Sequence, residues 1–329
     1  MTIQSLAKYP SKMPSAIFLD SAGVINDNTQ RAPQWIRYLS EYIPTTVLGG
    51  TAQVWGQANA QIIRPFFSRW HEYMMQAIEL AAEAQAKAIA AGQDPAEVES
   101  GSNKETNVYW IFERYHLLIW IKEMCRVASP HLPELESKIL PGLTDDELVQ
   151  LGRSAHIYAI ERVRADYPGA VDAIRKLDTI RKAHGDHSFK LCTSSSDSFE
   201  DLQHILKGLG VLECFDDLYG SDKVNSLKIS SLYYQRVFSR VGVNVVQRDG
   251  ASGVVVEGGE DRDEVVVLDD SVKALSWARV LGARTVLISA EAVDLSAEGY
   301  SHVDYQLKAL SELPGLLESW RAHLAGCPV

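Results

Sequence analysis

The sequence predicts an α/β protein whose parallel sheet is interrupted, after its first strand, by an all-α insertion. Three observations lead to this class. A short apolar run, residues 16–19, ends at Asp20 and is followed by a turn. A long stretch with helical spacing comes next, and strands alternate with helices from residue 170 onward. Because such alternation is typical of parallel sheets, we expect the first strand to join the C-terminal sheet.

Length and composition agree with two folded units. The chain has 329 residues, of which 46% are hydrophobic and 23% are charged. This length exceeds what one core usually supports, and the composition is that of a globular protein. We expect an α/β core formed by residues 1–25 and 165–329, and an α-helical cap formed by residues 26–164.

The expected cap contains two long helices, because residues 61–91 and 106–127 show helical spacing of apolar side chains. The segment 91–106 between them carries helix breakers and is expected to be a loop. Most of the cap's aromatic residues should form its own core, while others would line a pocket suited to an apolar or aromatic ligand. These aromatic residues are Trp35, Tyr38, Tyr42, Trp55, Phe66, Phe67, Trp70, Tyr73, Tyr109, Trp110, Phe112, Tyr115 and Trp120.

The C-terminal part predicts regular alternation of short strands with helices. The expected helices span residues 170–183, 198–208, 230–241 and 272–281, with a last helix before the C-terminus. The expected strands span residues 189–192, a short piece near Leu218, 265–268 and 284–288. The glycine-rich stretch 248–263 interrupts this alternation of strands and helices and is expected to form a surface hairpin or excursion.

Charge and hydropathy exclude several classes of function. The net charge of −11 argues against a nucleic-acid partner, although a small anionic ligand remains compatible with it. The sequence has no apolar run long enough for a membrane span and no signal-peptide pattern at its start, so we expect a cytoplasmic protein with no membrane partner. Its four cysteines have no metal-binding spacing, which agrees with a reducing compartment.

Polar side chains follow the predicted strands at the points where these strands end. They are Asp20, then Thr193 or Ser194, and the pair Asp269-Asp270. Ligands of open parallel sheets bind at the carboxyl ends of the strands, so we expect these residues to form one site. Carboxylates suit Mg²⁺, and hydroxyl groups suit the oxygens of a phosphate.

This pattern resembles the haloacid dehalogenase-like (HAD) hydrolase superfamily over nearly the whole chain. The run IFLDSAGVI, residues 17–25, is similar to the first motif of the superfamily, and LCTSSS, residues 191–196, to the second. Lys228 stands where the third motif usually reads Lys-Pro, and VVVLDD, residues 265–270, is similar to the fourth. The resemblance implies a Rossmann-like parallel-sheet core with an α-helical cap inserted after the first strand.

The resemblance also implies a Mg²⁺-dependent phosphatase that acts on a small organic phosphate. Asp20 would be the nucleophile that forms an aspartyl phosphate. Thr193, preferred to Ser194, would hold a phosphate oxygen, together with Lys228 or, in reserve, Lys223. Gly23 would contribute to the turn that surrounds the substrate phosphate.

The same resemblance implies the metal ligands. Asp20, Asp270 and the backbone carbonyl of Ala22 would hold Mg²⁺, and Asp269 would act from a second shell. Mg²⁺ keeps several of its waters, so one or two protein carboxylates suffice.

Ala22 departs from the phosphatase pattern, in which a second aspartate at this position serves as general acid and base. Three explanations remain open. A natural aspartate was replaced by alanine to slow turnover, or the protein follows the phosphonoacetaldehyde hydrolase branch, or it is an impaired enzyme that binds a phosphorylated ligand. The phosphonoacetaldehyde branch needs a cap lysine for a Schiff base, and residues 48–54 contain none. A dehalogenase is a further alternative, but it needs no Mg²⁺ and would leave the Asp269-Asp270 pair unexplained.

Overall fold

The computed structural model describes residues 4–5, 9–183, 189–243 and 264–326. The chain divides into two compact units, a core unit of residues 1–28 and 165–329 and a cap unit of residues 29–164. The core unit retains the chain as far as residue 28, beyond the boundary expected at residue 25. Two contacts hold this turn in the core unit: Asp27 N donates to Ala165 O at 2.7 Å, and Asn26 forms a β-bridge with Asp166.

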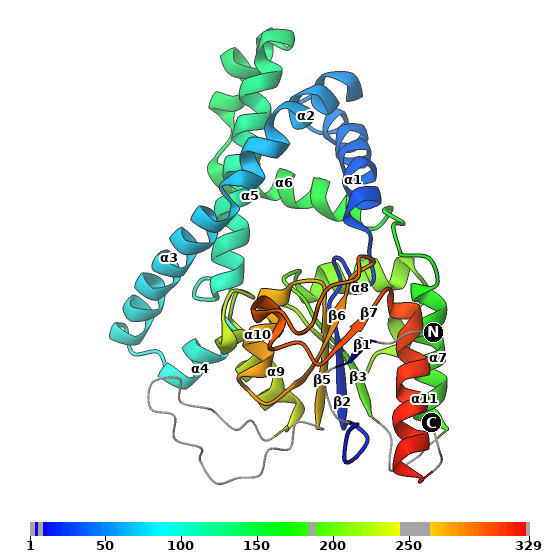
Figure 1. The fold of residues 1–329 in the computed structure, drawn as a ribbon. Helices are drawn as coiled ribbons and strands as arrows, with labels where there is room; N and C mark the ends of the chain where they lie inside the picture. The colour runs from blue at the N-terminus through cyan, green and yellow to red at the C-terminus, as the bar shows by residue number, and fades with distance from the viewer. Residues whose placement is uncertain (1–3, 6–8, 184–188, 244–263, 327–329) are drawn as a thin grey trace. The chain divides into compact units, whose positions relative to one another are not determined.

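The core unit is organised around one sheet, which has seven strands among the described residues (Figure 1). In chain order the strands are β1 (Gln4–Ser5), β2 (Ala16–Leu19), β3 (Lys190–Ser194), β4 (Asp217–Tyr219), β5 (Val265–Asp269), β6 (Arg284–Ile288) and β7 (Tyr305–Leu307). Across the sheet their order is β1-β7-β6-β5-β2-β3-β4. β1 pairs antiparallel with β7, and every other pairing in the sheet is parallel. The α/β class with a parallel sheet is therefore confirmed.

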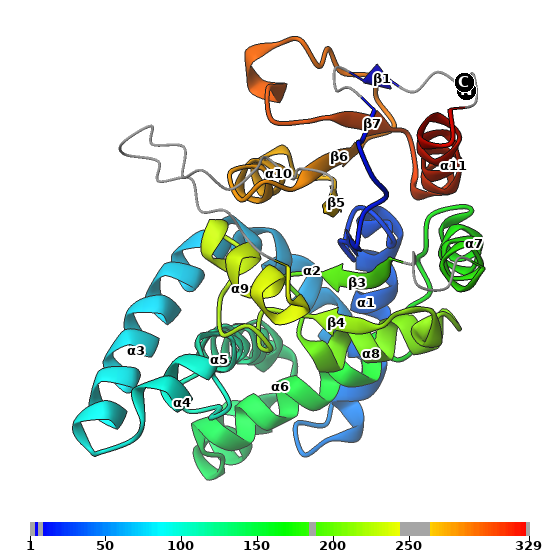
Figure 2. The ribbon, with the colours of Figure 1, turned by 90° about the horizontal axis from the view of Figure 1, so that it is seen from below.

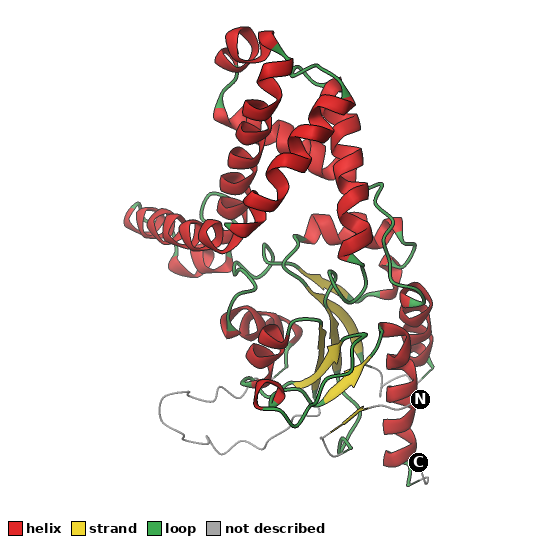
Figure 3. Cartoon of the chain, turned by 45° about the horizontal axis from the view of Figure 1, so that its top comes forward, coloured by secondary structure: helices red, strands yellow, loops and turns green. Residues whose placement is uncertain are grey.

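Helices cover both faces of this sheet, as Figures 2 and 3 show. One face packs against α7 (Ala170–Lys182), α8 (Phe199–Gly208) and α11 (Leu313–Leu324). The other face packs against α9 (Ser231–Val241) and α10 (Val272–Arg279). Strands buried on both faces need apolar side chains at successive positions, which is why β2 and β5 read as unbroken apolar runs.

Two strands were not expected from the sequence. β1 has two residues and β7 has three, so neither is long enough to show a strand period in the sequence. Both lie at the edge of the sheet beyond β6. The glycine-rich stretch 248–263, expected to be a surface hairpin or excursion, lies outside the described residues.

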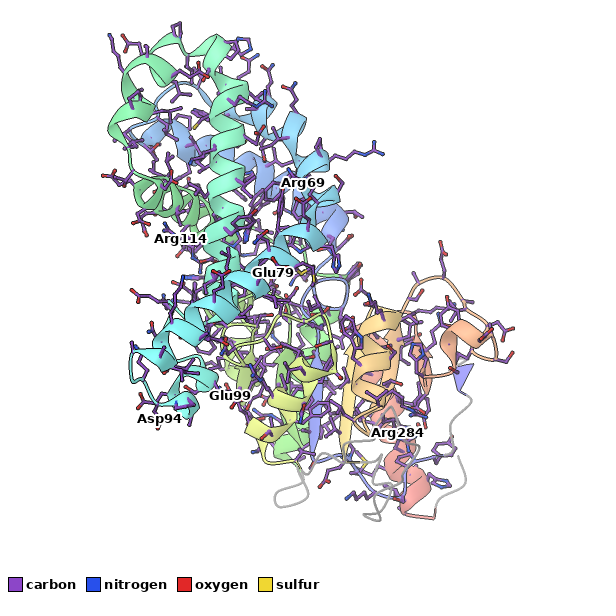
Figure 4. The ribbon with its side chains drawn as sticks, turned by 90° about the vertical axis from the view of Figure 1, so that its left-hand side faces the viewer. Arg69, Glu79, Asp94, Glu99, Arg114 and Arg284 are labelled. Atoms are coloured by element: carbon purple, nitrogen blue, oxygen red, sulfur yellow. The ribbon has the colours of Figure 1, made fainter. Side chains whose placement is uncertain are left out.

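The cap unit is built from helices. They are α1 (Asn28–Tyr42), α2 (Ala52–Ser68), α3 (Trp70–Ala90), α4 (Pro95–Ser100), α5 (Val108–Ala128) and α6 (Asp145–Ile160), with short 3-10 and π turns between some of them. Arg114 on α5, which is labelled in Figure 4, forms an ion pair with Asp146 in the first turn of α6, and this pair joins two of these helices. None of the described helices combines the length and the apolar composition that crossing a bilayer requires.

Six of the thirteen aromatic residues named in the sequence analysis are buried in the core of the cap unit, fewer than the majority expected. The side chains of Trp55, Phe66, Tyr73, Tyr109, Phe112 and Trp120 are all buried. Phe67, in contrast, is 52% exposed. The expected loop 91–106 contains the short helix α4, which Asp94 caps by accepting from Ala96 N and which ends at Gly101 with a φ of 73°.

Candidate active site

The ends of the three central strands place three polar side chains on one face of the sheet. Leu19 of β2 pairs with Thr193 of β3 and with Leu268 of β5, so the next residues, Asp20, Ser194 and Asp269, lie at one level. Side chains alternate between faces along a strand. Phe18, Cys192 and Val267 pack toward α9 and α10. The alternation therefore directs Asp20, Ser194 and Asp269 to the same side.

Lys228 lies among these three residues. It belongs to the connection between β4 and α9, and its side chain is only 6% exposed. Its Nζ lies 3.1 Å from Asp20 Oδ1 and 2.7 Å from Asp269 Oδ2, and it donates to Ser194 O at 2.8 Å. One ammonium thus bridges two buried carboxylates from neighbouring strands.

Three carboxylates gather at this point. One carboxylate oxygen each from Asp20, Asp269 and Asp270 can be chosen so that all three lie within 4.8 Å of one another. The pKa of Asp20 is raised to about 8, mainly by burial and also by the nearby Asp269 and Asp270, while Lys228 acts in the opposite direction. Burial and Asp269 likewise raise the pKa of Asp270. The ammonium of Lys228 thus does not balance the negative charge that gathers at this site.

The side chain of Lys228 is positively charged. Burial lowers the pKa of this lysine, but the attraction of Asp20 and Asp269 outweighs burial, so that the pKa is raised overall. Lys228 is therefore an ammonium at any physiological pH. It offers N–H donors and a positive charge to an anion that reaches Asp20.

The turn after β2 brings the backbone close to Asp270. Gly23 has a φ of +82°, which favours glycine, and its N donates to Asn26 O at 2.8 Å. A Cβ at this position would lie 2.0 Å from Asp270 Oδ2. Ser21 N donates to Asp20 Oδ1 at 2.8 Å and orients the expected nucleophile. The turn thus fixes Asp20 at one end and leaves room for Asp270 at the other.

Ala22 lies within this turn and is half-buried. It forms a β-bridge with Asn26. Its methyl group cannot donate or accept a proton, so the position that carries a general acid in phosphatases is chemically inert here.

The geometry revises the expected choice between the two hydroxyl groups. Thr193 faces the layer of α7 and α8, one level below Asp20, and its Oγ1 accepts from Tyr219 N at 2.9 Å. Ser194 lies level with Asp20 on the side of Lys228. The structure therefore places Ser194, and not the preferred Thr193, on the side of Asp20 and Lys228, because successive residues of a strand face opposite sides.

Lys223, the reserve candidate, is not brought to the site. Its Nζ lies 2.8 Å from Asp217 Oδ1 and 4.4 Å from the centre of the Phe199 ring. Its ammonium is therefore paired with the residue that begins β4. Lys228 is therefore the lysine that the structure places beside Asp20, although Ile229 follows it instead of the usual proline.

The sequence argument missed Tyr234, which contacts the site from α9. Its hydroxyl donates to Asp269 Oδ2 at 3.1 Å, and its side chain is fully buried. Ser271 N donates to Asp269 Oδ1 at 2.8 Å, so both oxygens of Asp269 have partners. Asp269 is therefore held toward Lys228. The clue in the sequence is a tyrosine on the apolar face of a helix, where a hydroxyl needs a buried partner.

Comparisons with known proteins give structural matches. No protein-family model matches the chain, and no curated protein matches its sequence. The defluorinating L-2-haloacid dehalogenase Rha0230 is 17% identical, with a TM-score of 0.51 over 95% of this chain and 99% of that chain. An L-2-haloacid dehalogenase from Xanthobacter autotrophicus is 13% identical, with a TM-score of 0.47 over 93% of this chain and 99% of that chain. The magnesium-bound HAD-hydrolase YfnB from Bacillus subtilis is 14% identical, with a TM-score of 0.44 over 93% and 99%.

At 17% identity, the match to Rha0230 concerns the fold. It covers nearly the whole length of both chains, so the inserted helices belong to the shared architecture as well as the sheet. The fold implied by the four sequence motifs is confirmed. The chain has the haloacid dehalogenase-like hydrolase fold, with its helical unit inserted between the first parallel strand and the rest of the sheet.

Proposed function

We propose that the protein is a Mg²⁺-dependent phosphatase that acts on a small organic phosphate, with Asp20 as the nucleophile. The observation that carries this proposal is a cluster of three carboxylates, two of which, Asp20 and Asp269, contact one buried ammonium. A cation-binding cluster next to a fixed lysine suits a phosphate group, whose oxygens need positive partners on several sides.

The residues present fit a magnesium ion. Their charges leave the site negative, and the raised pKa of Asp20, to about 8, reflects burial among acids without a second cation. Asp20, Asp270 and the Ala22 carbonyl would hold the ion, with Asp269 engaged instead by Lys228 and Tyr234. When bound, Mg²⁺ neutralises charge on the phosphate oxygens and so favours attack by an anion.

Side chains of the protein then carry out the transfer of the phosphoryl group. An Asp20 oxygen forms a bond to phosphorus while the bond to the ester oxygen breaks and its electron pair leaves with the alkoxide. A water hydrolyses the resulting acyl phosphate, which releases inorganic phosphate and restores the carboxylate. Lys228 and the Ser194 hydroxyl hold the transferring oxygens. No side chain at position 22 protonates the alkoxide, so esters with poor leaving groups should react slowly.

Ala22 also favours a second candidate function, the binding of a phosphorylated ligand with little turnover. The same lysine, hydroxyl and metal ligands would serve such a binder, because they hold the phosphate without needing a general acid. The two candidate functions concern the same class of phosphorylated ligand and differ in the rate at which the protein hydrolyses it.

Two other activities have less support. A dehalogenase also uses an aspartate nucleophile, but its chemistry needs no metal and leaves the cluster of Asp20, Asp269 and Asp270 without a role. A phosphonoacetaldehyde hydrolase would need a Schiff-base lysine in the cap, and residues 48–54 supply none.

The test is a screen of phosphate esters and 2-haloacids, with and without Mg²⁺, which measures phosphate and halide release. Asp20→Asn serves as the control for the nucleophile. Mg²⁺-dependent phosphate release that Asp20→Asn abolishes would support the phosphatase. Tight Mg²⁺-dependent binding of phosphate esters without release would support the ligand binder, and metal-independent halide release would overturn both.

A further inference from the structure

The core unit contains a cavity of about 360 Å³ beside the carboxylate cluster. Its wall includes Gly23 and Asp270, which also form the candidate active site. The other wall residues come from the turn after β2, the segment that enters α7, the start of α10, the end of β6 with the segment that follows it, and the segment that follows β7. All of them belong to the core unit. A ligand held at Asp20 and Asp270 therefore has a preformed space next to it within the same unit.

The segment after β6 that forms one wall is held in place by hydrogen bonds. Gln306 of β7 is 6% exposed, and its side-chain amide donates to Ser289 O at 3.1 Å and to Glu291 O. The amide oxygen of the same residue accepts from Val293 N at 3.1 Å. Ser289 N in turn donates to Leu307 O at 3.0 Å. These bonds fix the wall before any ligand arrives, so the cavity needs no rearrangement to admit one.

The wall combines apolar side chains with polar groups and carries a single positive charge. Side chains such as Val24, Val272 and Val293 supply apolar surface, and Tyr167 and Tyr300 supply aromatic rings. Lys308 is the one basic residue in the described wall, and Asp270 is the one acidic residue. Lys308 N donates to Glu312 Oε2 at 2.8 Å, which fixes the backbone at the base of this lysine. The lysine side chain is exposed and can accept an anion.

We propose that this cavity binds the alcohol part of the phosphate ester and that Lys308 pairs with a carboxylate on it. The inference rests on the proposed function, because it places the phosphate at Asp20. The substrate class that we infer is a phosphorylated hydroxy acid whose carbon skeleton is small and either apolar or aromatic. A cavity of this size lies within the usual range for small-molecule sites. One lysine suits a carboxylate, whereas a second phosphate usually meets several donors.

The test compares two series of phosphate esters by calorimetry in the presence of Mg²⁺. One series consists of straight-chain ω-carboxyalkyl phosphates of increasing length, and the other of alkyl phosphates of matching length. The proteins are the Ala22 chain, Lys308→Met, Lys308→Arg and Ala290→Trp, which narrows the cavity at an exposed wall position. Lys207→Met removes an exposed lysine on α8, which does not line the cavity, and controls for net charge.

We expect the carboxylated series to bind more tightly at one chain length, by about five- to tenfold, as for a charge-assisted contact. Lys308→Met should abolish this preference, while Lys308→Arg and Lys207→Met should retain it. Ala290→Trp should weaken the longer members of both series and leave inorganic phosphate unaffected.

A carboxylate preference that survives Lys308→Met, or no preference at any length, would overturn the cavity proposal while Mg²⁺-dependent phosphate binding upholds the proposed function. Absence of Mg²⁺-dependent binding for every phosphate tested would overturn the proposed function and the cavity proposal together.

Discussion

The backbone of Gly23 lies so close to Asp270 that a single methyl group at position 23 would overlap the Asp270 carboxylate. A Cβ there would lie 2.0 Å from Oδ2 and 2.2 Å from Cγ. The atoms in the way belong to a side chain, which can turn aside. The first consequence of a larger residue at position 23 is therefore a displaced carboxylate.

Gly23→Ala should weaken Mg²⁺ binding by about tenfold or more, in the range seen when a metal ligand loses its support. It should also cost about 1 kcal/mol in stability, because alanine is strained at positive φ. Gly282→Ala is the matched control, since Gly282 has a φ of +85° and nothing within 4 Å of its would-be Cβ. The control should show the stability loss alone. Equal Mg²⁺ affinity in both variants, measured by calorimetry, would contradict the role given to Asp270.

Asp270→Asn and Asp269→Asn should separate the two adjacent acids. Asp270→Asn removes a charged metal ligand and should weaken Mg²⁺ binding by about ten- to a hundredfold. Asp269 instead holds Lys228 at 2.7 Å and accepts from Tyr234, so its amide variant should affect Mg²⁺ less. Calorimetric titration of both variants with Mg²⁺ provides the comparison. The reverse order of effects would show that the acids have been assigned the wrong way round.

Lys228→Met should destabilise the protein strongly. It removes the ammonium between Asp20 and Asp269 and leaves two buried carboxylates without their positively charged partner, a change that typically costs about 3–5 kcal/mol. Adding Asp269→Asn should recover part of the loss, because one of the stranded charges disappears. Urea unfolding without Mg²⁺ gives the free energies. A double variant that is less stable than Lys228→Met alone would argue against this electrostatic account.

Ser194→Ala and Thr193→Val should have different effects. Ser194 lies level with Asp20, and loss of its hydroxyl should weaken inorganic phosphate binding by about three- to tenfold, the usual value of one hydrogen bond. Thr193→Val should leave phosphate binding intact and lower stability, because Tyr219 N loses its acceptor. Phosphate titration and urea unfolding of both variants distinguish the two roles. Weakened phosphate binding in Thr193→Val alone would restore the original preference.

The sheet core and most of the site could be predicted from the sequence, because strands buried in a parallel sheet have a recognisable local pattern of apolar residues. Buried parallel strands are apolar on both faces, so the polar residue that ends each of them stands out, as Asp20 and the pair Asp269-Asp270 do. Lys228 was found by its motif. The structure then placed it between the two carboxylates.

The remaining features depend on geometry that a sequence does not record. The end of a strand is uncertain by one residue, and that residue decides whether Thr193 or Ser194 faces the site. The contact between Tyr234 and Asp269 joins residues far apart in the chain, so no local pattern indicates it. The cavity beside Asp270 arises from five separate segments, and the strand β7 that supports it has only three residues.

The proposal that this site transfers phosphate makes a definite prediction for position 22. Ala22→Asp supplies the missing proton donor two residues from the nucleophile. General acid–base help of this kind contributes about 10²–10⁴ in rate. The gain should be larger for alkyl than for aryl phosphates, because alkoxides are poorer leaving groups. This contrast distinguishes proton donation from a simple improvement in folding or metal affinity.

The most direct test is therefore the rate of Mg²⁺-dependent phosphate release by Ala22→Asp, on paired alkyl and aryl phosphates, beside the Ala22 protein and Ala22→Asp/Asp20→Asn. The account predicts a rise of about 10²–10⁴ for alkyl esters, a smaller rise for aryl esters, and no release without Asp20. A folded, Mg²⁺-binding Ala22→Asp protein that releases phosphate no faster than the Ala22 protein from any ester would contradict the phosphatase assignment.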